Sequence, residues 1–223
     1  IMDFQDFLEY VPKLMEVPLP AEEAHFKMAP LERIESLKNL KIETKNPKTA
    51  AVMMLFYPKN GMTHLVLIVR NSYQGVHSAQ IAFPGGKYEP RDQIFENTAL
   101  RETHEEVGVH PQLVTVHSQL SPLSTFVSRS YIVPVLATVP EKPELSMSSY
   151  EVDRTLWVPL AELVRDDTFS WEWWNFDRVE FADDRPMFFF HLDDETIWGA
   201  TARILHELLC VIHGVNHFDL PNC

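Results

Sequence analysis

The chain has 223 residues and 45% of them are hydrophobic, so it can bury the core of one domain with a modest appendage and is not a disordered tail. Asp and Glu number 32 against 19 Lys and Arg, and the formal net charge of −13 argues against a protein that grips nucleic acid through general surface charge. A small anionic substrate is compatible with this balance, because a bound metal cation can reverse the local field.

The number of cysteines and the length of the apolar runs indicate the cellular compartment. Cys210 and Cys223 are too few for a disulfide framework, which favours a reducing, cytoplasmic setting. The longest apolar run, residues 50–57, is far shorter than a membrane span. Acidic side chains interrupt residues 3–9, so we expect neither a signal peptide nor a membrane partner.

The first part of the chain reads as an appendage. Apolar side chains recur at helical spacing over residues 3–16, and Pro12 is expected to end or bend that helix. Prolines punctuate residues 17–48. We therefore expect residues 1–48 to form an N-terminal helical extension, packed on a main domain of residues 49–223.

The main domain mixes strands and helices. In chain order we predict strands over 50–57, 63–70 and 79–83, a helix over 92–107, strands over 113–120, 130–139 and 156–158, a helix over 159–164, a strand over 187–192 and a helix over 196–213. Asp92 is the expected N-cap of the first of these helices, and Gly108 closes it. The connections are hairpins rather than regular βαβ units, so the fold class is α+β, or a helix–sheet–helix sandwich.

The helix over 92–107 carries an acidic cluster. Glu102, Glu105 and Glu106 are spaced i, i+3 and i+4, which places them on one side, opposite positions that can pack. Like charges at this spacing repel one another unless divalent cations sit among the carboxylates. Carboxylate, water and phosphate oxygens suit Mg²⁺ or Mn²⁺, and Arg101 beside them could fix one carboxylate.

Two adjacent glycines precede this helix. Gly85 and Gly86 follow a predicted strand, and glycine lets a backbone carbonyl or amide approach a metal ion or a phosphate closely. Taken singly, a solvated glutamate face and an ordinary loop are the simpler interpretations. Their combination over residues 85–108 predicts a metal and phosphate site.

This stretch resembles the Nudix box, G-x5-E-x7-R-E-U-x-E-E-x-G-U, in which U is a bulky apolar residue. Residues 101–109 match its second half, apart from Thr103 at an apolar position. In the first half Asp92 stands in place of the usual Glu, and eight residues rather than seven separate it from Arg101.

The same insertion occurs in the coenzyme A pyrophosphatase branch of the Nudix hydrolases. Arg70 and residues 83–86 match an upstream element of that branch, R-S/A-x3-R-x3-G-x3-F-P-G-G, although Gly75 and Ala79 replace its second Arg and its first Gly. Further segments similar to that branch are residues 98–102, 131–135, 157–160 and 197–202.

The resemblance implies a Nudix α/β/α sandwich with a mixed β-sheet, and metal-dependent pyrophosphohydrolysis of a nucleoside diphosphate derivative. Glu102, Glu105 and Glu106 would hold Mg²⁺ or Mn²⁺ together with a carbonyl of the glycine pair, for which we take Gly86. Arg101 would orient the glutamates. Metal ions in such a site neutralise the diphosphate and lower the pKa of a bound water.

Further catalytic and binding residues follow from the resemblance with alternatives open. The catalytic base is either a box glutamate or a distal acid, for which Glu151 is the first candidate and Asp153 the second. Arg70 is a candidate phosphate ligand, because a guanidinium matches phosphate oxygens, and a surface charge at a strand end is the alternative. His77, Gly85 and Lys87 complete the expected substrate contacts.

The expected substrate is coenzyme A or an acyl derivative, cleaved to 3′,5′-ADP and (acyl-)phosphopantetheine. ADP-ribose, NADH or another nucleotide derivative is the alternative, favoured by Gly75 and Ala79. A nucleotide-binding Nudix domain without hydrolysis is a second alternative, although it usually lacks a metal-ligand glutamate. A small nucleotide is thus the expected partner, and a homodimer is a family-level expectation.

Overall fold

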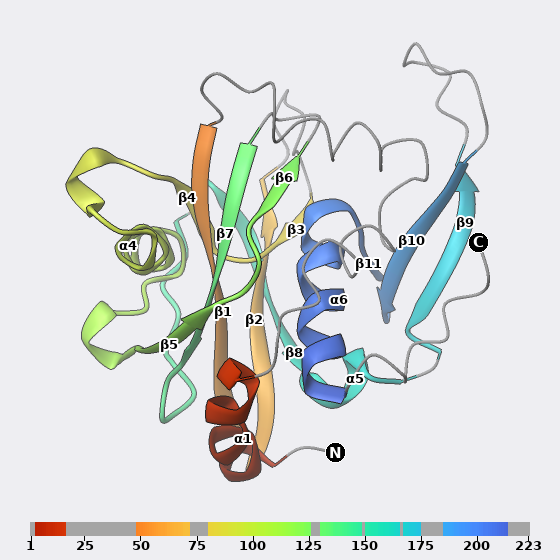
Figure 1. Ribbon diagram of the computed structural model, residues 1–223, viewed down its shortest axis with the longest axis horizontal. Helices are drawn as coiled ribbons and strands as arrows, with labels where there is room; N and C mark the ends of the chain where they lie inside the picture. The colour runs from red at the N-terminus through yellow and green to blue at the C-terminus, as the bar shows by residue number, and fades with distance from the viewer. Residues whose placement is uncertain are drawn as a thin grey trace.

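A computed structural model of the chain describes residues 3–16, 48–71, 80–125, 130–148, 150–165, 167–174 and 185–213. Within these ranges an eight-stranded sheet forms the middle layer (Figure 1). Helix α4 (Phe95–Val107) covers one face, and α1 (Phe4–Glu16) and α6 (Gly199–His213) cover the other. This arrangement confirms the predicted α+β class and the α/β/α sandwich.

The centre of the sheet explains why it is mixed. Strands β1 (Lys48–Lys59) and β2 (Met62–Arg70) form the predicted antiparallel hairpin. Asn60 and Gly61 make its turn with φ of 53° and 77°, the positive values that a tight hairpin requires to follow the strand twist. On its other edge β1 runs parallel to β7 (Ser130–Thr138).

The remaining strands attach to this centre. The main path runs β3-β2-β1-β7-β5, while β4 pairs with β1, β6 with β7 and β8 with β2. Their bounds are β3 Ile81–Ala82, β4 Gly85–Lys87, β5 Thr115–Gln119, β6 Leu123–Thr125 and β8 Val152–Pro159. Short strand β4 fixes the glycine pair against the central strand, with Val52 opposite Gly85 and Ala51 opposite Gly86.

Strand β1 is buried on both faces because helices cover both sides of the sheet. Met54 and Phe56 pack in the cluster beneath α1 and α6, whereas Met53 and Leu55 pack in the cluster beneath α4. A strand covered on both faces shows no polar alternation, which accounts for the continuous apolar run in the sequence.

Helix α1 is part of the same core as the main domain. Phe7 is fully buried, and its ring centroid lies 4.7 Å from that of Phe56 on β1. The Tyr10 hydroxyl donates to the carbonyl of Ile212 on α6 at 3.2 Å. Pro12 does not end the helix, because it stands on the exposed side, where water can satisfy the freed carbonyl. The 48/49 boundary stays a prediction.

A second sheet lies beyond α6 (Figure 1). Strand β10 (Arg185–Leu192) pairs antiparallel with β9 (Phe169–Trp174) and with β11 (Glu195–Ile197). A short helix, α5 (Leu160–Leu163), follows β8 as predicted. The last helix begins at Gly199 rather than at residue 196, because residues 195–197 pair with β10.

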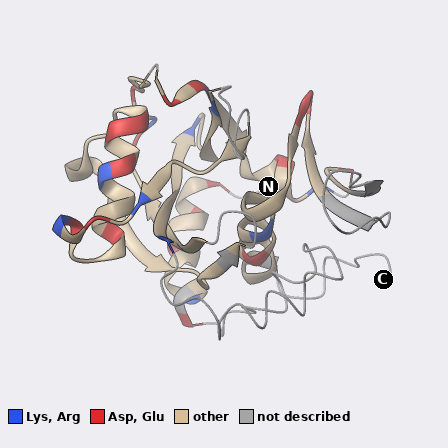
Figure 2. Cartoon of the chain, turned by 90° about the horizontal axis from the view of Figure 1, so that it is seen from above, with Lys and Arg blue, Asp and Glu red and all other residues tan. Residues whose placement is uncertain are grey.

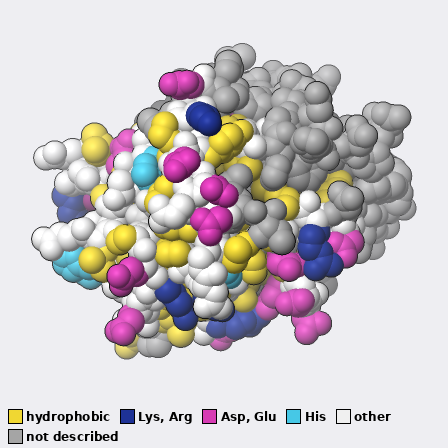
Figure 3. Space-filling model, turned by 90° about the horizontal axis from the view of Figure 1, so that it is seen from below, with side chains coloured by type: hydrophobic (Ala, Val, Ile, Leu, Met, Phe, Trp, Pro, Cys, Tyr) yellow, Lys and Arg dark blue, Asp and Glu magenta, His cyan; other side chains and the backbone are white. Residues whose placement is uncertain are grey.

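Two surface observations complete the fold. In the part of the chain that the structure describes, every helix is too short or too polar to cross a membrane. On the face seen from below, Lys and Arg side chains stand beside Asp and Glu side chains rather than in a basic stretch (Figure 3). Among the described residues of that face, the basic side chains form no broad positive surface for a polyanion.

Candidate active site

Three glutamates of α4 differ sharply in exposure, although the helix carries them on neighbouring turns. The acidic positions of the helices are red in Figure 2. The side chain of Glu105 is 51% exposed, that of Glu102 is 13% exposed and that of Glu106 is 1% exposed. The prediction of one exposed acidic side is therefore wrong for Glu106, because β4 packs over that part of the helix. The cluster runs from solvent into the protein interior.

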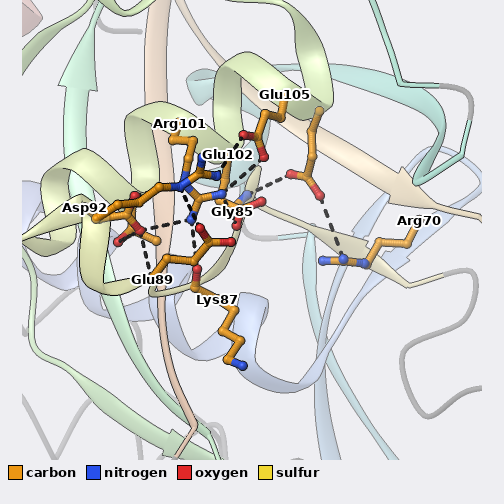
Figure 4. A network of polar contacts seen from close by, with 11 residues as sticks. Arg70, Gly85, Lys87, Glu89, Asp92, Arg101, Glu102 and Glu105 are labelled. Carbon is orange, nitrogen blue, oxygen red and sulfur yellow. Dashed lines mark hydrogen bonds and ion pairs between the residues drawn. The ribbon is translucent and has the colours of Figure 1, made fainter.

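Glu106 is held by the strand that carries the glycines. Its two neighbours, Gly85 and Arg70, are labelled in Figure 4. Its Oε2 accepts the backbone N–H of Gly85 at 2.8 Å, and its Oε1 lies 3.8 Å from Nη2 of Arg70 without a hydrogen-bond partner. Burial raises the pKa of Glu106 to about 7, although the Gly85 amide and the Arg70 charge both lower it. The buried oxygen without a partner is available to a cation.

The two glycines are needed for different reasons. A Cβ on Gly85 would stand 2.4 Å from the carbonyl oxygen of Ala51, because β4 runs close against β1. A Cβ on Gly86 would stand 2.5 Å from the carboxyl carbon of Glu102. Gly85 therefore lets the strands meet, and Gly86 makes room for a carboxylate of the helix.

Arg101 binds the cluster together (Figure 4). Its Nε and Nη2 donate to Asp92 Oδ1 and Oδ2 at 2.9 and 3.0 Å, and Nη2 also donates to the Lys87 carbonyl at 2.9 Å. Its Nη1 donates to Glu102 at 2.8 Å and to Glu105 at 3.1 Å. The predicted orienting role therefore has a geometric basis that reaches two glutamates rather than one.

Asp92 does not cap α4, contrary to the sequence prediction. It ends a short 3-10 helix, η1 (Pro90–Asp92), and Ile94 occupies the N-cap position. Its buried carboxylate accepts the Thr98 hydroxyl at 2.9 Å and the Glu89 N–H at 2.9 Å as well as Arg101. The bonds from Arg101 hold the pKa of Asp92 well below its ordinary range.

The donor set fits a divalent cation. Glu102, Glu105 and Glu106 supply hard carboxylate oxygens, one of which is buried without a partner. Gly86, predicted to add its carbonyl, lies on β4 against the carboxylate of Glu102. Among the described residues no three acidic, His or Cys side chains already converge as a metal cluster. The guanidinium of Arg101 instead contacts the carboxylates of Glu102 and Glu105.

Glu151 lies beside this cluster. It directly precedes β8, its carbonyl accepts the Asn71 N–H at 3.0 Å, and the N–H of Ser148 in the same loop donates to the Glu106 carbonyl at 2.9 Å. Burial raises the pKa of Glu102, and the charge of Glu151 adds to that shift as it does at Glu106. Glu151 therefore acts electrostatically on two of the box glutamates.

The other predicted residues divide by position. Arg70 stands at the end of β2 and is 27% exposed beside Glu106. Lys87 contributes its carbonyl to Arg101, while its side chain points away from the glutamates (Figure 4). Asp153 is exposed and pairs with Arg154 at 3.3 Å. His77 falls outside the described residues.

Sequence reasoning missed one cation at the site. Arg91 in η1 has its Nε 2.6 Å from Glu89 Oε2 and its Nη2 3.8 Å from Glu105 Oε1. A basic residue directly before Asp92, in the five-residue spacer between Gly86 and Asp92, was the available signal.

Comparison with known proteins identifies the class. Residues 47–184 match the model of the NUDIX domain. A relative in Photorhabdus laumondii, "Uncharacterized Nudix hydrolase NudL", is 34% identical over 164 residues, covering 73% of this chain and 84% of the relative. "Nudix hydrolase 22, chloroplastic" of Arabidopsis thaliana is 33% identical over 175 residues, covering 75% of this chain and 56% of the relative.

A solved MutT/nudix family protein from Enterococcus faecalis is 18% identical, with a TM-score of 0.49 over 86% of this chain and 73% of that one. The family match covers more than half of the chain, so the chain belongs to the Nudix family. It is a Nudix pyrophosphohydrolase that acts on small nucleotide derivatives, in agreement with the acidic helix and glycine pair described above.

Proposed function

We propose that this enzyme uses Mg²⁺ or Mn²⁺ to cleave the diphosphate of coenzyme A or acyl-coenzyme A. The products would be 3′,5′-ADP and (acyl-)phosphopantetheine. Support for the substrate comes from Arg70, residues 83–86 and the segment 98–102, which resemble the coenzyme A pyrophosphatase branch, and from the extra residue between Asp92 and Arg101.

The observation that carries the catalytic part is the carboxylate of Glu106. One oxygen is fixed by the Gly85 amide, and the other is buried without a hydrogen-bond partner. A divalent cation held there, and by Glu102 and Glu105, would supply charge neutralisation for the diphosphate and an acidified water. Arg101 keeps those two carboxylates side by side.

Glu151 is the proposed general base. It is exposed, so water and substrate can reach it. Its charge contributes to the raised pKa of Glu102 and of Glu106. A box glutamate is the alternative base, and Glu105 is the most exposed of the three. Glu151→Gln separates the two: if Glu151 is the base, kcat falls by about 10² or more while Mn²⁺ affinity changes little, because Glu151 acts on the metal-ligand glutamates only through its charge.

The substrate test is a panel of coenzyme A, dephospho-coenzyme A, ADP-ribose, NADH and diadenosine tetraphosphate, with Mg²⁺ and then Mn²⁺. Chromatographic detection of 3′,5′-ADP, with coenzyme A as the preferred substrate, is the expected result. If coenzyme A is cleaved no faster than ADP-ribose, the substrate assignment fails. Gly75 and Ala79 at the altered positions favour ADP-ribose or a dinucleotide as the second candidate.

Glu105→Gln distinguishes an enzyme from a nucleotide-binding domain. Removing a ligand charge should lower kcat by about 10² or more, since metal positioning and charge neutralisation are both impaired. Glu9→Gln on the exposed side of α1 is the matched control and should retain wild-type turnover. Absence of turnover in the wild-type protein with either metal would favour binding without hydrolysis.

The remaining expectations belong to the same proposal. The cysteine content favours a reducing, cytoplasmic setting, and a homodimer is expected from the family resemblance. Analytical ultracentrifugation of the full chain tests the dimer directly. A sedimentation coefficient of a 25.8 kDa monomer at micromolar concentration would contradict it.

A further inference from the structure

Three guanidinium groups stand beside the box glutamates, and they differ in exposure and in how firmly they are held by hydrogen bonds. Arg101 is 16% exposed and donates to two carboxylates besides Asp92. Arg70 is 27% exposed and its Nε is buried. Arg91 is 65% exposed. Among the described arginines that pair with Glu102, Glu105 or Glu106, Arg91 can therefore reorient toward a ligand at least cost.

The backbone around Arg91 is fixed although its side chain is not. Pro90 opens η1, and Asp92 closes it as a buried residue whose carboxylate accepts the Glu89 N–H at 2.9 Å. The guanidinium lies between two acids: Nε is 2.6 Å from Glu89, and Nη2 is 3.8 Å from Glu105. Exposed ion pairs of this kind are weak, so an incoming ion can exchange for them readily.

The two oxygens of Glu105 each face an arginine. Oε2 accepts from Arg101 at 3.1 Å, and Oε1 faces Arg91 at 3.8 Å. A divalent cation on Oε1 would take the place of the more distant and more exposed guanidinium. The released guanidinium would then lie next to a bound cation whose other ligands are phosphate oxygens, which its planar fork matches.

We propose that Arg91 is a phosphate-binding residue of this site, which neutralises Glu105 in the free protein and turns to the substrate when a cation takes Glu105. This inference rests on the proposed function. The ligand is a phosphate group of the nucleotide, either the diphosphate or the additional 3′-phosphate of coenzyme A, since both present the same oxygens. The proposal explains why an arginine, Arg91, stands at the exposed end of the glutamate cluster.

The first test is kinetic. Arg91→Gln should raise KM about tenfold and leave kcat within about twofold, because one charge-assisted contact to the substrate is lost. Arg165→Gln is the matched control, since Arg165 is 54% exposed and pairs only with Glu162 and Asp167 among described residues. An equal rise for coenzyme A and dephospho-coenzyme A assigns the contact to the diphosphate, and a rise for coenzyme A alone assigns it to the 3′-phosphate.

The second test needs no turnover. Titration of the nucleotide-free protein with Mn²⁺, followed by electron paramagnetic resonance of the free ion, should show up to about fivefold tighter binding in Arg91→Gln, because the competing guanidinium is gone. Arg91→Lys should lie between the two. An unchanged KM or an unchanged Mn²⁺ affinity overturns the proposal. If the wild-type protein hydrolyses nothing, the proposed function fails, while the Mn²⁺ titration still tests the exchange at Glu105.

Discussion

The backbone amide of Gly85 donates a 2.8 Å hydrogen bond to the buried carboxylate of Glu106, and this bond joins β4 to α4. The orientation of an acid on the helix therefore depends on the path of a strand 21 residues earlier. Because Gly85 itself is set by its close approach to β1, the central strand, the glycine strand and the acidic helix form one mechanical unit. Substitutions at each contact should separate stability from metal binding.

Gly85→Ala should lower the free energy of unfolding by about 2 kcal/mol or more and abolish hydrolysis, because the new Cβ meets backbone that cannot move aside. The obstacles are the Ala51 carbonyl oxygen at 2.4 Å and the Cα of Val52 at 2.6 Å. Urea unfolding and the substrate panel measure both effects. Gly199→Ala is the control: its φ is also positive, at 65°, but nothing lies within 4 Å, so only a backbone cost of about 1 kcal/mol is expected.

Gly86→Ala, unlike Gly85→Ala, should impair metal binding more than it impairs stability. Its Cβ meets the Glu102 carboxylate, which is the end of a flexible side chain and can swing aside. We expect the free energy of unfolding to change by less than about 1 kcal/mol. Mn²⁺ affinity should fall at least about tenfold, because a metal-ligating carboxylate is displaced. Unchanged Mn²⁺ affinity in a folded Gly86→Ala protein would remove Glu102 from the metal ligands.

Asp92→Asn should destabilise the protein by about 3 kcal/mol at pH 7, since it leaves the guanidinium of Arg101 without its main counter-charge. The pKa of Asp92 is lowered on folding, chiefly by Arg101. Its contribution is therefore complete above the ordinary aspartate pKa and is lost as pH falls below about 4. The difference between wild type and variant should narrow from pH 5 to pH 2.

Chemical denaturation at several pH values measures the difference in free energy of unfolding between wild type and variant. Groups that titrate alike in both proteins cancel in this difference. Asp153→Asn is the matched control, because Asp153 is 57% exposed and its partner Arg154 lies at 3.3 Å. We expect that variant to follow the wild-type pH profile. A constant gap between Asp92→Asn and wild type across the acidic range would contradict the assigned pKa shift.

Glu106→Gln should make the metal-free protein more stable at alkaline pH. Burial raises the pKa of Glu106 to about 7, so the folded protein binds a proton that the unfolded chain has released. The stability of the wild type must then fall as pH rises from the ordinary glutamate pKa to about 7, and the loss is complete above that value. Above pH 8 we expect Glu106→Gln to be about 1–3 kcal/mol more stable than wild type.

The same variant should lose hydrolysis, so stability and function would move in opposite directions. In the wild type, Mn²⁺ affinity should rise with pH between about 6 and 8, because metal binding displaces the proton. Calorimetry in buffers of different ionisation enthalpy counts that proton. A metal affinity that is flat over this pH range would show that Glu106 is already ionised in the free protein.

The sequence predicted most of this fold because periodicity is local. The hairpin of β1 and β2, the acidic helix and the last helix each show a clear pattern. The short strands β4, β6, β9 and β11 were missed. Strand β11 pairs with the adjacent β10 in a tight hairpin, with Glu195 opposite Leu192, and part of it was assigned to the last helix. Likewise, Pro12 suggested a helix end, but tertiary packing on one side and water on the other tolerate it.

The sequence predicted which residues make up the candidate site, but not how deeply each of them is buried. Spacing places Glu102, Glu105 and Glu106 on adjacent turns, but helix geometry alone does not say that β4 covers Glu106. The role of Asp92 also required the structure, because an acid just before a helix fits a cap as well as a buried partner for Arg101. Burial and long-range pairing set these differences, and neither is a property of local sequence.

Helix α1 offers a test of whether residues 4–16 are an appendage or part of the domain. Phe7 is fully buried against Phe56 of the central strand, so Phe7→Ala should cost about 3–5 kcal/mol and cause early loss of activity on heating. Gln5→Ala, on the exposed side of the same helix, should change stability by less than about 0.5 kcal/mol. Thermal unfolding measured together with hydrolysis gives both values. If Phe7→Ala unfolds like wild type, α1 only covers the domain; a single, lowered transition shows that α1 folds cooperatively with the sheet.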